Sequence, residues 1–110
     1  MSNHYHDPAD LRFFKDMAKL APTDFNAWFA LDKAVGRDDA AIPRKFRELL
    51  ALAVAFTTQC PYCIEVHTKN AKAAGASREE VSETAFIAAA LRAGGAATHG
   101  AMALKLYEQS

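Results

Sequence analysis

The stretch Leu49-Leu50-Ala51-Leu52-Ala53-Val54-Ala55-Phe56 decides the fold, because it places eight apolar residues in a row ahead of Cys60-Pro61. Pro43 is suited to the first position of a helix that continues to about Thr58. Within that helix the stretch is apolar on every side, so we expect the helix to be buried all round.

Working outward, Pro, Gly and capping residues divide the rest of the chain into further helices. We predict a first helix that Asp7-Pro8 opens and Pro22 closes, and a second that runs from an N-cap at Thr23 to Gly36. The fourth helix should run from Pro61 to near Gly75. The fifth should begin at the capping box Ser77-Arg78-Glu79-Glu80 and end at Gly94-Gly95, and a last helix should run from about Ala96 to Glu108.

Composition favours the same fold class. The chain contains 24 Ala but only seven Val and Ile together, and Ala is the strongest helix former. With 110 residues, 51% of them hydrophobic and 24% charged, the chain fits one globular domain. We therefore expect an all-α bundle of about six helices, forming a single domain over residues 1–110.

Charge and hydropathy exclude some partners. Lys and Arg number 13, as do Asp and Glu, which argues against nucleic acid or an acidic membrane surface. No apolar run approaches the ~18 residues of a membrane span, and residues 1–7 lack the pattern of a secretory signal. We expect a soluble, cytoplasmic protein, and we assign no function to His4 and His6 near the N-terminus.

Apolar surface exceeds what so short a chain can cover. Small domains bury only about 60–65% of the surface that their unfolded chain exposes. We therefore expect apolar helix faces to meet another subunit.

The chemically informative stretch is Cys60-Pro61-Tyr62-Cys63-Ile64-Glu65-Val66-His67, which holds both cysteines of the chain. If Pro61 begins a helix, both thiols lie at its N-terminus, where the helix dipole and free amide groups favour thiolate. The spacing places Cys60, Cys63 and His67 on one helix face, so His67 can exchange a proton with Cys63. The two sulfurs are also close enough in sequence for a reversible disulfide.

Other interpretations of this stretch remain open. Haem attachment requires His directly after the second cysteine, and Ile64 stands there instead. A structural zinc site would use Cys60, Cys63 and His67, but the usual second pair of ligands is missing. The cysteines could also be inert small residues of the core.

Glu48 stands where the apolar helix enters the core. A desolvated carboxylate there would suit proton transfer, whereas an ion pair with Arg44 one turn back is the simpler alternative. If the helices before and after Gln59-Cys60 run antiparallel, Glu48 and His67 are offset by roughly 6 Å along the axes. That offset suits a relay from Glu48 through His67 to the thiols, with a bridging water.

This central part of the chain resembles the alkylhydroperoxidase AhpD and carboxymuconolactone decarboxylase superfamily. The residues that carry the resemblance are Glu48-Leu49-Leu50-Ala51-Leu52-Ala53-Val54-Ala55, Cys60-Pro61-Tyr62-Cys63, His67, Ala71, Ala74-Gly75-Ala76 and Glu80. The resemblance covers about residues 44–83. It implies an all-helical subunit that forms homotrimers or homohexamers, with Glu48, Cys60, Cys63 and His67 as a catalytic proton relay and no cofactor. It also implies an antioxidant enzyme whose dithiol reduces hydroperoxides, or passes electrons from lipoyl-type dithiols to a peroxiredoxin.

One residue departs from the family pattern. The better-known peroxidase has a His beside the second cysteine where this chain has Tyr62, and a phenol is a poor base near neutral pH. We predict a thiol peroxidase or disulfide oxidoreductase in which Cys63 attacks and Cys60 resolves, although the sequence does not rank the two sulfurs. The alternatives are a decarboxylase of the same superfamily and a non-enzymatic helical or zinc-binding module.

Overall fold

The computed structural model describes residues 5–110, and every regular element in that range is helical. The elements are a 3₁₀ helix η1 (Pro8–Phe13), α1 (Phe14–Leu20), α2 (Pro22–Val35), α3 (Arg44–Thr58), α4 (Pro61–Ala73) and α5 (Arg78–Glu108). The predicted all-α fold class is confirmed, with five α-helices and one 3₁₀ helix in this range.

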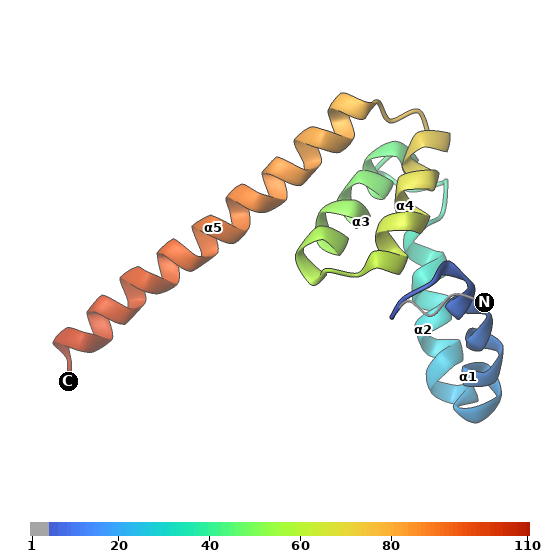
Figure 1. Cartoon of the computed structure of the whole chain (residues 1–110), viewed down its shortest axis with the longest axis horizontal. Coiled ribbons are helices and arrows are strands. Elements are labelled where there is room, and N and C mark those ends of the chain that lie inside the picture. The colour runs from blue at the N-terminus through green and yellow to red at the C-terminus, as the bar shows by residue number, and fades with distance from the viewer. Residues whose placement is uncertain (1–4) are drawn as a thin grey trace.

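Helices α3 and α4 form the centre of the molecule. They lie side by side, and the first half of α5 packs against α3 (Figure 1). Leu49 and Leu52 of α3 meet Ala71 of α4 in a small core, and partly buried side chains from the ends of the helices cover it. The turn between α3 and α4 therefore carries the cysteine segment at one end of this core.

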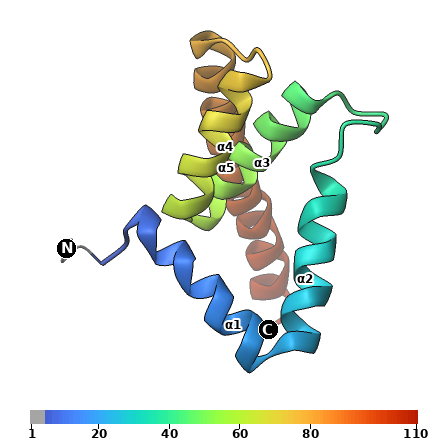
Figure 2. The same cartoon turned by 90° about the vertical axis from the view of Figure 1, so that its right-hand side faces the viewer.

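The N-terminal helices form a separate hairpin beside that centre, as Figure 2 shows. Asp7 and Asp10 make a capping box at the start of η1, so Asp7 opens the first helical segment as predicted. Pro22 is the first residue of α2 and Ala21 is its N-cap, whereas the sequence pointed to Thr23. An aromatic cluster holds α1 to α2, made by Phe14, Phe25, Trp28 and Phe29.

The predicted break at Gly94-Gly95 is wrong, because α5 is one helix of 31 residues. A glycine inside a helix costs only about 1 kcal/mol, and neither of these glycines has the positive φ of a helix stop. Gly75 does have it, with φ of 95°, directly after α4. The fifth and sixth predicted helices are therefore continuous.

Helix α3 is not buried all round within one chain, contrary to the sequence expectation. Leu49, Leu52 and Ala55 are buried on one side. On the other side Phe46, Leu50 and Val54 keep 46%, 54% and 61% of their surface exposed. Only α4 and the first half of α5 are available to cover α3, so this stripe faces outward.

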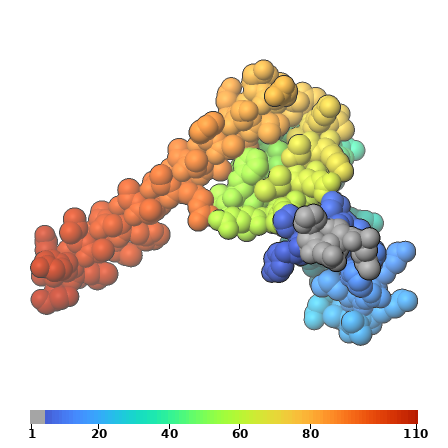
Figure 3. Space-filling view, viewed as in Figure 1, coloured from blue at the N-terminus to red at the C-terminus, as the bar shows by residue number. Residues whose placement is uncertain are grey.

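The molecule is elongated. Its radius of gyration is 18.1 Å, against about 13 Å for a compact domain of this length. The distal half of α5 projects away from the rest of the chain, as Figures 1 and 3 show. Within residues 5–110 no helix combines the length and apolar character needed to span a membrane.

Candidate functional site

The turn between α3 and α4 positions the two cysteines. Gln59 ends α3 in the left-handed conformation, with φ of 57°, and this reverses the chain direction. Cys60 follows in extended conformation as the N-cap of α4, and Pro61 occupies the first helical position as predicted. Cys63 therefore lies in the first turn of α4, directly above Cys60.

The two sulfur atoms are 2.7 Å apart, in direct contact with each other. The backbone N–H of Cys63 also donates to Cys60 Sγ, at 3.3 Å. Both side chains are free thiols and half-buried. The structure thus brings the predicted cysteine pair together at a helix N-terminus.

These contacts give the two thiols different pKa values. The hydrogen bond between the two thiols lowers the pKa of Cys60, and backbone N–H groups lower it further. Burial, followed by the hydrogen bond with Cys60, raises the pKa of Cys63 to about 11. Negative charge therefore develops first on Cys60, which favours the opposite order of attack from the one predicted with His67 as the base for Cys63.

Glu48 and His67 meet directly rather than through a water. Glu48 on α3 is 5% exposed, and its Oε2 lies 2.6 Å from Nδ1 of His67 on α4. A carboxylate only accepts, so Nδ1–H of His67 donates the hydrogen bond. The Nε of Arg44 lies 3.8 Å from the other oxygen of Glu48. Glu48 thus makes both of the contacts considered from the sequence, the ion pair with Arg44 and the contact with His67.

The relay is incomplete as a chain of direct contacts. Among the hydrogen bonds of residues 5–110, none joins His67 to Cys60 or to Cys63. The structure therefore contains two separate pairs, the thiol pair at the start of α4 and the Glu48–His67 pair that joins α3 to α4. Proton exchange between His67 and the thiols stays a prediction.

Sequence reasoning missed the partner of Tyr62. The Tyr62 hydroxyl donates a hydrogen bond of 2.7 Å to Asp10 Oδ2 on η1, across 52 residues of sequence. That hydrogen bond lowers the pKa of Asp10 and raises the pKa of Tyr62. Neither residue carries a local sequence signal for this contact, since it depends on where η1 docks.

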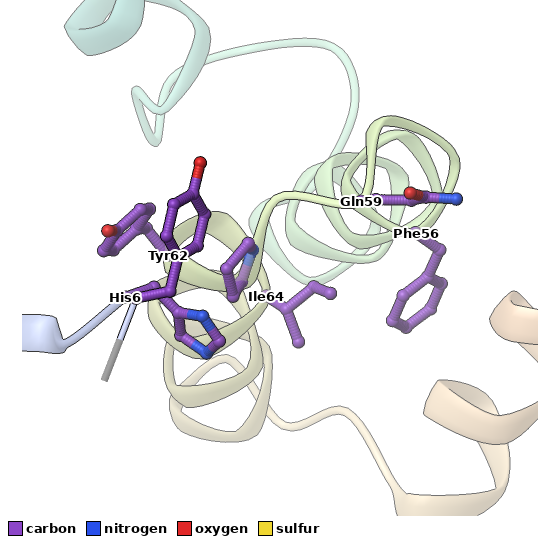
Figure 4. Close-up of a pocket in the computed structure, with 7 residues that line it drawn as sticks. His6, Phe56, Gln59, Tyr62 and Ile64 are labelled. Atoms are coloured by element: carbon purple, nitrogen blue, oxygen red, sulfur yellow. The ribbon is translucent and has the colours of Figure 1, made fainter. Parts of the chain in front are cut away.

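A hollow of about 830 Å³ lies beside the cysteine segment, at the N-terminal end of α4 (Figure 4). Gln59, Pro61, Tyr62 and Ile64 line it, together with Phe56 and residues 5–6. His6, to which the sequence assigned nothing, stands edge-on to Tyr62 with ring centroids 6.2 Å apart. His4 lies outside the described residues.

Residues 5–110 contain no group of three or more His, Cys, Asp or Glu side chains arranged to hold a metal ion. Cys60, Cys63 and His67, the set considered for zinc, do not form such a group. The side chains that the described residues bring together are a thiol pair and, separately, a buried carboxylate in contact with an imidazole.

Comparison with known proteins identifies relatives of the whole chain. It is 42% identical over 107 residues to a Paracoccus denitrificans protein named uncharacterized protein 4 in cox locus, covering 92% of this chain and 96% of the relative. A Cupriavidus necator protein of undescribed function is 28% identical, covering 88% of this chain and 85% of the relative.

The fold has a solved counterpart. The crystal structure of a carboxymuconolactone decarboxylase family protein from Legionella pneumophila superposes with a TM-score of 0.61 and 33% sequence identity. The match covers 89% of this chain and 83% of that protein. The sequence model of the same family matches residues 22–106, a range that includes all four predicted site residues. The chain therefore belongs to the carboxymuconolactone decarboxylase family.

Proposed function

We propose that the chain is a thiol-dependent oxidoreductase that reduces hydroperoxides, or exchanges disulfides, with the Cys60–Cys63 pair. The observation that carries this proposal is the 2.7 Å separation of the two sulfurs at the N-terminus of α4. Contact at this range lets a small rotation bring the sulfurs to the ~2.05 Å of a disulfide bond. A pair of half-buried thiols in such contact is suited to reversible oxidation.

With a hydroperoxide as oxidant, the Cys60 thiolate attacks one peroxide oxygen. The O–O bond breaks, Cys60 becomes a sulfenic acid, and the alkoxide takes a proton from solvent and leaves as the alcohol. The sulfur of Cys63 then attacks the sulfenic acid. The S–S bond forms, and the hydroxyl leaves as water with the proton that Cys63 gives up.

The disulfide must be reduced before another turnover. A dithiol of the lipoyl type supplies two electrons and two protons by exchange, and it becomes a disulfide itself. A peroxiredoxin disulfide in place of the hydroperoxide would draw the electrons onward by the same exchange. A cytoplasmic location suits this cycle, because reductants there return exposed disulfides to thiols.

Glu48 and His67 act on protons in this proposal. Glu48 fixes the His67 ring with hydrogen on Nδ1, which leaves Nε2 to accept a proton through water. Since Cys63 holds its proton tightly, with a pKa of about 11, a nearby base assists the resolving step most. His67 is thus a general base for Cys63 during disulfide formation rather than during the first attack.

A second candidate is a decarboxylase-type enzyme of the same family. The separation of the Glu48–His67 pair from the thiols favours it, because this pair forms an acid–base unit without any sulfur contact. Chemistry of that kind would leave both thiols unchanged.

Turnover assays distinguish these candidates. We expect the protein to consume cumene hydroperoxide with dihydrolipoamide as reductant, and we expect Cys60→Ser or Cys63→Ser to reduce steady turnover by a hundredfold or more. Ser82→Ala, on the exposed surface of α5, serves as the matched control. Absence of peroxide and disulfide turnover in the reduced wild-type protein would contradict the proposal.

A further inference from the structure

We infer that Asp10 is a positioning residue for the thiol pair: by accepting the Tyr62 hydrogen bond, it anchors the first turn of α4, which carries both cysteines. The inference deepens the proposed function, because the Cys60 thiolate is the attacking group there. Three observations carry it: the place of Tyr62 in the turn, the backbone groups around Cys60, and the attachment of the N-terminal hairpin to the rest of the chain.

Tyr62 lies between the two cysteines. Cys60 is the N-cap of α4, and Tyr62 directly precedes Cys63 in the first turn. The Tyr62 hydroxyl donates to Asp10 Oδ2 at 2.7 Å, across 52 residues of sequence. The ring of His6 stands edge-on to the Tyr62 ring, as Figure 4 shows. The side chain between the cysteines is therefore held by a segment outside α4.

The backbone of the same turn influences the acidity of Cys60. The hydrogen bond with the Cys63 thiol lowers the pKa of Cys60 most, and the backbone N–H groups of Cys63 and Tyr62 lower it further. The amide nitrogen of Cys63 lies 3.3 Å from Cys60 Sγ. Helix ends fray, and a frayed first turn would move these N–H groups away from the sulfur. An anchor on Tyr62 therefore preserves the donors that stabilise the Cys60 thiolate.

The anchor belongs to a hairpin that otherwise packs on itself. Helices α1 and α2 pack together, and α3 packs against α4 and α5, with only slight packing between these two groups in residues 5–110. Figure 2 shows the open end of the hairpin toward α3 and α4. Arg47 of α3 donates to the Val35 carbonyl at the end of α2, and Tyr62 of α4 donates to Asp10 on η1. The hairpin is thus joined to the centre at both ends, and the Tyr62 contact reaches the cysteine segment.

The route from Asp10 to Cys60 passes through Tyr62. Asp10 acts on Tyr62, whose pKa its hydrogen bond raises, whereas the groups that shift the pKa of Cys60 are those of its own turn. From α2, the Asp32 carboxylate acts on Cys63, where it adds to burial and the hydrogen bond with Cys60 in raising the pKa. Removing the Tyr62 hydroxyl should therefore change Cys60 through the backbone of the turn.

The test follows Cys60 by iodoacetamide labelling and peptide mapping over a pH series, without any peroxide. Tyr62→Phe removes the hydroxyl and leaves the capping box of η1 in place, whereas Tyr107→Phe makes the same change at an exposed position near the end of α5. We expect Tyr62→Phe to slow labelling of Cys60 at pH 7 about threefold or more and to move its pH profile upward. Tyr107→Phe should stay within about twofold of the wild-type rate.

Variants of Asp10 use the same readout. Asp10→Asn keeps an oxygen that accepts from Tyr62, so its labelling should stay within about twofold of wild type. Asp10 also accepts from the Asp7 N–H at 2.9 Å, so Asp10→Ala removes a helix cap as well as the anchor. A double variant separates these roles, because Asp10→Ala combined with Tyr62→Phe should label Cys60 no more slowly than Tyr62→Phe alone.

The outcomes distinguish this inference from the proposed function. Equal labelling of Tyr62→Phe and Tyr107→Phe, or a further slowing in the double variant, would overturn the positioning role, while peroxide turnover by the wild-type protein would still support the proposed function. Slower labelling of Cys60 in Tyr62→Phe, with no peroxide or disulfide turnover by the wild-type protein, would contradict the proposed function and support the positioning role.

Discussion

At the scale of single residues, the two cysteine thiols differ in pKa because they occupy different positions at the start of α4. Cys60 is the N-cap of α4, where the hydrogen bond with the Cys63 thiol and the backbone N–H groups lower its pKa. Burial and the hydrogen bond with Cys60 raise the pKa of Cys63 to about 11. Cys60 is therefore the more acidic of the two thiols.

This difference predicts the order of alkylation. A thiol of lower pKa has more thiolate at neutral pH, so iodoacetamide should modify Cys60 first, while Cys63 stays protonated until the pH approaches 11. Peptide mapping after brief labelling at pH 7 measures the ratio, and labelling in urea, where both thiols are exposed, provides the control. Faster modification of Cys63 in the folded protein would contradict the assignment.

A second residue-scale prediction concerns Glu48. Replacing it by Gln removes the charge that His67 and Arg44 share, so Glu48→Gln should lower the free energy of unfolding by about 1–3 kcal/mol. It should also lower peroxide turnover by about tenfold or more, because the His67 ring loses its fixed orientation.

Glu65→Gln is the matched control, since Glu65 pairs with Lys69 on the exposed side of α4. Its effect on the free energy of unfolding should stay below about 0.5 kcal/mol. Urea unfolding and steady-state kinetics measure both variants. Equal stability losses in the two variants would show that the buried carboxylate has no special role.

Much of the candidate site could be predicted at this scale because it is local. The spacing of Cys60, Cys63 and His67 follows from one helix, and the approach of Glu48 follows from an antiparallel turn. The Asp10–Tyr62 contact could not be predicted in the same way. It depends on how η1 docks on α4, which no helical periodicity encodes.

At the scale of helices, the predicted start of α5 is confirmed, whereas the stop predicted at Gly94-Gly95 is wrong. Ser77 and Glu80 form the predicted capping box at the start of α5, and two hydrogen bonds of 3.0 Å and 2.9 Å join them. Gly94-Gly95 looked like a helix end in the sequence, but no proline follows it and neither glycine has a positive φ, so nothing there stops the helix. A helix start is defined by specific hydrogen bonds, whereas a glycine only weakens a helix.

The capping box gives an element-scale prediction. Ser77→Ala removes the oxygen that accepts from the Glu80 amide, so it should lower the free energy of unfolding by about 1 kcal/mol. Ser82→Ala, on the exposed side of the same helix, should change it by less than about 0.5 kcal/mol. Thermal or urea unfolding measures the difference. A cost at Ser82 equal to that at Ser77 would contradict the assigned cap.

At the scale of the whole molecule, one chain leaves too much apolar surface open. Phe46, Leu50 and Val54 face outward on α3, and the distal half of α5 projects away from the other helices of residues 5–110. Helix α5 also exposes large apolar side chains, among them Ile87, Leu91 and Leu104, and extended apolar surface of this kind is typical of an interface. We propose that copies of the chain cover these surfaces for one another, in the trimer or hexamer that the family resemblance implies.

Native mass spectrometry tests the assembly. The mass should be three or six times 12.0 kDa. Leu91→Glu places a charge at an apolar position of α5 that is 69% exposed in one chain, so it should shift the population toward smaller species. Ser82→Glu adds the same charge to the same helix at a polar position and should not. A wild-type mass of one chain would contradict the assembly.

The central claim is that Cys60 and Cys63 exchange electrons as a pair, and stoichiometric oxidation tests it most directly. One equivalent of cumene hydroperoxide should remove both thiols, lower the mass of the chain by two hydrogen atoms, and yield a peptide in which Cys60 is joined to Cys63 after digestion without reductant. Dihydrolipoamide should then restore both thiols. Thiols that survive the peroxide unchanged, or a chain that gains oxygen without forming the disulfide, would contradict the account.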